Sequence, residues 1–210
     1  AKTIETEIFD NGLQDIYQKI IDEKNRPKRL LYVDIEVSPS LVFTWNIGHK
    51  VNLSHDNIVK EREIICVCWK WADNQTVGSL KWDKGDDYQM LKQFAPILNS
   101  ADAVIGHNLK NFDLKWLKTR CLYHGIEVNK QFQVIDTLTL ARSNFRFNSN
   151  RLDYISKFLG NTGKKETSYS LWKDIVLNNC KTAMNTMVDY CKNDVLILQD
   201  VHEKINKYVP

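Results

Sequence analysis

Apolar and polar positions alternate with two different periods along the chain, and the change of period divides it into a strand-rich and a helix-rich part. Short runs rich in β-branched and aromatic residues predict three strands in a row, over residues 30–37, 63–71 and 76–82. From residue 88 the apolar positions follow helical spacing. The later elements that we expect are helices over 88–98 and 111–124, strands over 103–106 and 132–135, and helices from 136 onward with loops near 146–150 and 160–168. This order predicts an α/β fold, in which a mixed sheet begins with three antiparallel strands and is flanked by helices.

The first residues form a separate element. Apolar residues recur at helical spacing over residues 4–24, and Pro27 disfavours helical geometry in the residue before it. We therefore expect an N-terminal amphipathic helix within residues 1–27 that packs on the body. The remaining residues, 28–210, have a length that suits one domain.

The composition bears on where the protein is located and on whether it is held by disulfides or zinc. No apolar run approaches the roughly 20 residues that span a bilayer, and charges stand where a signal peptide needs an apolar stretch. The five cysteines are an odd number without a CxxC pair, which argues against a disulfide framework and a structural zinc site. We expect a cytoplasmic protein with no membrane segment.

Charge is informative only once its distribution is known. The chain has 29 Lys and Arg against 26 Asp and Glu, a net +3 that is too small to indicate a polyanionic partner. Residues 141–181, however, hold eight basic against three acidic residues, a local balance of +5, interleaved with aromatic residues. Such a segment suits a groove for single-stranded nucleic acid, and the alternative is an ordinary solvated helical surface.

Two carboxylates stand in the middle of the first apolar strand. Side chains alternate along a strand, so Asp34 and Glu36 project from one face while Val33, Ile35 and Val37 project from the other. Paired carboxylates repel each other, and a hard divalent cation such as Mg²⁺ or Mn²⁺ removes that cost. The alternative is an edge strand with a solvated acidic face.

Two further acidic positions lie on predicted helices. Asp113 falls in the first turn of the helix that follows the strand at 103–106, where the alternative role is to complement the helix dipole. Tyr190 and Asp194 are four residues apart, so they share one face of the last helix.

Together these residues resemble the DEDD superfamily of 3′–5′ exonucleases, whose ribonuclease H-like fold gathers four acidic residues around two metal ions. Asp34 and Glu36 match its DxE motif, Asn108 with Phe112 and Asp113 matches its second motif, and Tyr190 with Asp194 matches the YxxxD motif of the tyrosine branch. Segments 136–138, 149–155 and 158–160 are similar to the proofreading domains of family B DNA polymerases. Free-standing, phage-encoded predicted exonucleases are more similar still, and the resemblance covers residues 28–206.

The resemblance implies a role for each motif residue. Asp34 would bridge two divalent cations, Mg²⁺ or Mn²⁺. Glu36 and Asp194 would complete the site on the side of the attacking water, Asp113 would support the other ion, and Tyr190 would orient the water. The expected substrate contacts are the Ile35 backbone, Asn108, Phe112 (alternatively a core residue), Asn150, Arg151, Lys164 and Lys165.

The resulting functional expectation is a two-metal 3′–5′ exonuclease that releases nucleoside monophosphates from DNA, preferably single-stranded. We expect a monomer, located in the host cytoplasm if it is phage-encoded. The sequence does not indicate whether a polymerase is its partner. The alternatives are a 3′–5′ exoribonuclease on the same fold, a non-catalytic nucleic-acid-binding module and, more weakly supported, a sequence-specific endonuclease.

Overall fold

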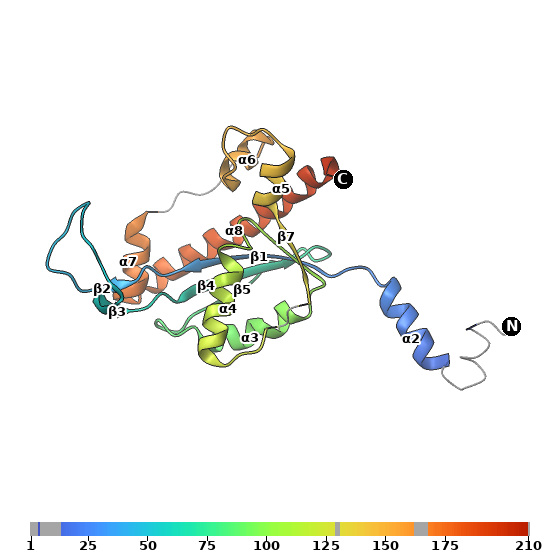
Figure 1. The fold of residues 1–210 in the computed structure, drawn as a ribbon, viewed down its shortest axis with the longest axis horizontal. Coiled ribbons are helices and arrows are strands. Elements are labelled where there is room, and N and C mark those ends of the chain that lie inside the picture. Colours follow the sequence, from blue (N-terminus) through green and yellow to red (C-terminus); the bar gives the residue numbers. More distant parts are fainter. Residues whose placement is uncertain (1–3, 5–13, 129–130, 162–167, 210) are drawn as a thin grey trace.

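The structure is a computed structural model, and it describes residue 4 and residues 14–128, 131–161 and 168–209. Apart from the two short strands β2 and β3, the strands come first and then alternate with helices, in the order that the hydrophobic pattern indicated (Figure 1). The elements are α2 (Gln14–Asn25), β1 (Leu30–Val37), β2 (Leu41–Val42), η1 (His55–Asn57), β3 (Ile58–Lys60), β4 (Ile64–Trp71), β5 (Gly78–Lys81), α3 (Tyr88–Asn99), β6 (Ala103–Gly106), α4 (Asp113–His124), β7 (Gln133–Asp136), α5 (Thr137–Asn144), α6 (Leu152–Phe158), α7 (Tyr169–Asn178), α8 (Lys181–Ile205) and η2 (Asn206–Tyr208).

The central sheet has five strands in the order β5-β4-β1-β6-β7. Strand β1 pairs antiparallel with β4, and β4 pairs antiparallel with β5. Strands β6 and β7 continue the other side of β1 in parallel. The predicted mixed sheet is confirmed, and β1 lies at its centre, where the antiparallel and parallel halves meet.

Each face of the sheet has its own apolar core. On one face, Leu31, Val33 and Ile35 of β1 pack with the buried residues of α3 and α4. On the other face, Tyr32 packs with the buried residues of the long helix α8 and of α5 to α7. Because side chains alternate along β1, Asp34 and Glu36 point to the same side as Tyr32, toward α8. The sequence pattern thus places both carboxylates between the sheet and α8.

The N-terminal helix α2 extends away from the sheet in Figure 1. None of its described residues is buried, and Ile16 and Ile20 are 56% and 59% exposed. Arg26, just after the helix, binds both carboxylate oxygens of Asp102 at 2.6 and 2.8 Å. This ion pair connects the end of α2 to the residue that precedes β6.

A small two-stranded sheet, β2 with β3, follows β1 and was not predicted. Its strands are short, and the segment between them exposes 92% of Trp45 and 96% of Ile47. Such an exposed segment lacks the buried alternation on which strand prediction depends.

Among the described residues, no helix is both long and apolar enough to cross a membrane.

Candidate functional site

Three of the four predicted acidic residues converge between β1 and α8. One carboxylate oxygen each from Asp34, Glu36 and Asp194 lies within 4.8 Å of the other two. Asp194 is only 1% exposed, although it carries a carboxylate. Three carboxylates at this spacing repel one another strongly, and a divalent cation with oxygen ligands offsets that repulsion. The donor set therefore fits a hard cation such as Mg²⁺ or Mn²⁺.

Asp113, the fourth predicted acidic residue, contacts the backbone of the same strand. It begins α4, it is 3% exposed, and its Oδ1 accepts a hydrogen bond from the Ile35 backbone N–H at 3.2 Å. Its oxygens do not belong to the group of three. Burial, with a smaller contribution from the negative charge of Asp136, raises the pKa of Asp113 to about 7. A cation close to Asp113 would lower this pKa and favour the ionised carboxylate.

Helix α8 supplies two more residues beside the acidic group. Tyr190 lies one turn before Asp194 and is 9% exposed. The Sγ of Cys191 lies 3.4 Å from both the backbone oxygen and the Oδ2 of Asp34. Burial raises the pKa of the Cys191 thiol, so the thiol stays protonated and can donate its proton to either oxygen. Cys191, for which the sequence predicted no role, therefore contacts Asp34 directly.

The loop that carries Asn108 is held by Asp136. Asn108 adopts a left-handed backbone conformation with φ of 66°. The Asp136 carboxylate accepts hydrogen bonds from the backbone N–H groups of Asn108 and Lys110, both at 3.0 Å, and from that of Leu138 at the start of α5. Because this carboxylate accepts hydrogen bonds from both the Asn108 loop and the first turn of α5, it fixes the loop against the helix. The sequence signal for this role was the position of Asp136, at the end of one strand and at the start of the next helix.

A cleft of about 800 Å³ opens above the acidic group. Asp34 and Asp194 line it on one side, and three basic residues, Arg142, Arg151 and Lys157, line it as well. The remaining lining residues are His107, Asn108, Leu138, Asn148, Ser149, Asn150, Leu152 and Asp153. The cleft thus combines a negative group that suits cations with positive side chains that suit phosphates.

The predicted substrate residues have different surroundings. Asn108, Asn150 and Arg151 line the cleft. Phe112 caps the start of α4, is 38% exposed and is not among the lining residues. Lys164 and Lys165 lie outside the described residues.

The basic, aromatic segment 141–181 is divided between the cleft and the core. Its aromatic residues Phe145 and Phe147 stack on each other and pack against the core cluster. Trp172 donates its Nε1–H to the backbone oxygen of Val37 at 3.2 Å. These three aromatic side chains support the structure and do not line the cleft, so the positive charge that this segment brings to the cleft comes from Arg142, Arg151 and Lys157.

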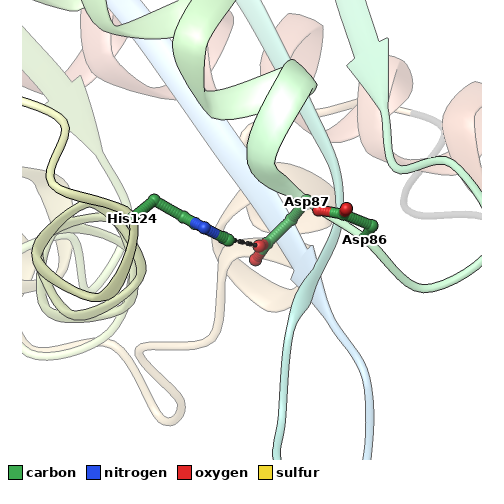
Figure 2. A group of neighbouring side chains, drawn as sticks. All are labelled: Asp86, Asp87 and His124. Atoms are coloured by element: carbon green, nitrogen blue, oxygen red, sulfur yellow. Dashed lines mark hydrogen bonds and ion pairs between the residues drawn. The ribbon is translucent and has the colours of Figure 1, made fainter.

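A second group of potential metal ligands lies at the start of α3 and the end of α4 (Figure 2). Asp87 is fully buried and accepts a hydrogen bond from His124 Nε2 at 2.6 Å. The guanidinium of Arg120 binds both oxygens of the same carboxylate at 2.8 Å, and the Ile64 N–H adds a further bond. Because a positive charge already neutralises Asp87, a metal ion would have to displace Arg120. This group is a structural ion pair.

The comparisons with known proteins agree with this architecture. A family model described as the RNase_H superfamily matches residues 55–206, more than half of the chain. The chain belongs to the RNase H superfamily. No curated protein matches the sequence.

Among solved structures, this RNase H superfamily member is similar to the family B DNA polymerase from the hyperthermophilic archaeon Pyrobaculum calidifontis. The two share 16% identity and superpose with a TM-score of 0.66. The match covers 86% of this chain but only 25% of the polymerase chain. The expected ribonuclease H-like fold is thereby confirmed. The family match includes Asp113, Tyr190 and Asp194, while Asp34 and Glu36 precede it in the sequence.

Proposed function

We propose that this RNase H superfamily protein is a two-metal-ion 3′–5′ exonuclease that hydrolyses single-stranded DNA to nucleoside monophosphates. The observation that carries the proposal is the group formed by Asp34, Glu36 and Asp194, two of which, Asp34 and Asp194, line a cleft that is also lined by basic residues. Acidic and basic groups in one cleft match the two needs of phosphodiester hydrolysis, a cation site and a place for the phosphate chain.

The acidic residues would hold two divalent cations, with Asp34 as the shared ligand, Glu36 and Asp194 on one side and Asp113 on the other. When bound, the cations would lower the pKa of the attacking water and stabilise the negative charge on the leaving 3′ oxygen. Tyr190 would orient the attacking water, because a phenol with a pKa near 10 is a weak base at neutral pH.

The substrate would run along the basic side of the cleft. Arg142 and Arg151 offer charge for the phosphates, whereas Lys157 is already paired with Asp153 at 2.9 Å. Asn108 and the Ile35 backbone would contact the terminal nucleotide. The preference for DNA is supported by the similarity to a DNA polymerase. The 3′–5′ direction is supported by the resemblance of the three sequence motifs to exonucleases of that polarity.

A 5′-labelled oligonucleotide tests the proposal. With Mg²⁺ or Mn²⁺ the protein should shorten it stepwise from the 3′ end, while Asp34→Ala and Asp194→Ala should leave it intact. Asp86→Ala is the matched control, because it removes an exposed carboxylate from the other acidic group and should keep full activity. Cleavage that survives EDTA or Asp34→Ala would contradict the mechanism.

The same assay separates the alternatives. Faster digestion of a matched RNA oligomer would identify an exoribonuclease. Binding without cleavage in either metal would identify a non-catalytic module, and cutting of closed circular DNA would identify an endonuclease.

A further inference from the structure

His107 connects two loops of the cleft that are distant in sequence. It follows β6 and directly precedes Asn108. Its Nδ1 lies 2.9 Å from Thr137 Oγ1 at the start of α5, and its Nε2 lies 2.9 Å from the backbone oxygen of Asn150. Asn150 in turn precedes Arg151, which lines the cleft and occupies the N-cap position of α6. The imidazole is therefore a bridge between the Asn108 loop and the 149–151 turn.

The direction of the critical hydrogen bond follows from the chemistry of its partners. The backbone oxygen of Asn150 can only accept, so Nε2 must carry a proton and donate to it. The Thr137 hydroxyl has one proton and two acceptors within reach, Nδ1 at 2.9 Å and the Gly106 backbone oxygen at 3.2 Å. It donates to Nδ1 when the imidazole is neutral and to Gly106 when Nδ1 is protonated. The bond to Asn150 is kept in both states.

The anchored side of this bridge is fixed independently. Thr137 is fully buried, and the neighbouring Asp136 carboxylate binds the backbone of Asn108 and Lys110. Within the 149–151 turn, the bond from the Arg151 backbone N–H to Ser149 Oγ is 3.4 Å long, longer than the 3.0 Å bonds that hold the Asn108 loop. His107 thus ties the 149–151 turn to a loop that Asp136 also holds.

We propose that His107 is a positioning residue that holds Arg151 and the Asn150 amide where the substrate's phosphate chain passes the acidic group. This inference rests on the proposed nuclease function. It assigns His107 no contact with the reacting atoms: the imidazole acts through the turn, so its loss should weaken the binding of the nucleic acid more than the chemical step.

Two substitutions of His107 by amide side chains separate the effect of its bond to Asn150 from the effect of its contact with Thr137. The amide nitrogen of Gln reaches the position of Nε2, so His107→Gln keeps the bond to Asn150. The amide of Asn reaches only the position of Nδ1, so His107→Asn keeps the contact with Thr137 and loses the bridge. His107→Asn should raise KM for an oligonucleotide roughly tenfold with little change in kcat, because one lost hydrogen bond of this kind is worth about that factor. His107→Gln should restore KM.

Coupling to Arg151 shows whether the bridge acts through the turn. In an Arg151→Ala background, His107→Asn should add no more than about a twofold rise in KM, since both changes then remove the same contribution. A full, multiplicative effect in the double variant, or equal KM values for His107→Asn and the wild type, would overturn the inference.

Binding without cleavage distinguishes this inference from the proposed function. Fluorescence anisotropy of a labelled oligo-dT in EDTA measures affinity when no hydrolysis occurs. Weaker binding by His107→Asn, restored in His107→Gln, supports the positioning role even if the wild type fails to cleave, which would overturn only the proposed function. Active wild-type protein with equal affinity in all three forms would overturn the positioning role alone.

Discussion

Asp113→Asn should stabilise the metal-free protein at alkaline pH, although it removes a proposed metal ligand. Burial raises the pKa of Asp113 to about 7 from an ordinary value of 3.8. Asparagine cannot ionise, and its Oδ1 can still accept the hydrogen bond from the Ile35 N–H that Asp113 accepts. The substitution therefore removes the cost of the buried charge and keeps the hydrogen bond.

The sign and size follow from proton linkage. A carboxyl group whose pKa is raised on folding stabilises the fold fully below pH 3.8, and this contribution is lost as the pH rises to about 7. A pKa difference of roughly three, at about 1.36 kcal/mol per unit, sets an upper limit of about 4 kcal/mol. Asp113→Asn should therefore have the same stability as the wild type near pH 4 and an advantage of up to about 4 kcal/mol at pH 8.

Urea unfolding in EDTA at several values between pH 4 and pH 8 measures this difference. Addition of Mg²⁺ at pH 8 should stabilise the wild type, because bound metal favours the ionised carboxylate, and should stabilise Asp113→Asn less. A difference in stability between the two proteins that does not change with pH would show that folding does not raise the pKa of Asp113.

Two further predictions concern buried polar groups outside the cleft. Asp87→Ala leaves Arg120 as a buried charge without its bidentate partner, and should lower the free energy of unfolding by about 3–5 kcal/mol in urea titrations; a loss below about 1 kcal/mol would contradict the assignment of this pair as structural. Burial lowers the pKa of His202, whose Nδ1 lies 2.9 Å from the Tyr32 hydroxyl. The neutral His202 imidazole therefore stabilises the fold fully above pH 6.5, and this contribution declines as the pH falls below 6.5. Thermal unfolding of His202→Leu from pH 7 to pH 5 should show a smaller decline than the wild type, and parallel curves would argue against this assignment.

The sequence predicted the parts of the fold that depend on local pattern. Strand β1 was predicted with its observed ends, because an apolar run that is buried on both faces lies between Pro27 and Pro39. Asp34 and Glu36 could be placed on one face from strand alternation alone. Their approach to Asp194 required the motif resemblance, because α8 follows more than 140 residues later in the chain.

Contacts between distant loops could not be predicted in this way. His107 and Asn150 meet through a backbone oxygen, which every residue type offers, so the identity of Asn150 carries no signal of the contact. The same holds for the bonds from Asp136 to the backbone of the Asn108 loop. Nothing in the sequence indicated that Cys191 contacts Asp34, because that contact depends on how α8 packs against β1.

An anomalous diffraction map of the crystallised protein soaked in Mn²⁺ tests the proposed two-metal site directly. We expect two peaks roughly 3.5–4 Å apart, one bounded by Asp34, Glu36 and Asp194 and the other by Asp34 and Asp113. Metal bound only on the surface, or no peak beside Asp34 at saturating Mn²⁺, would contradict it.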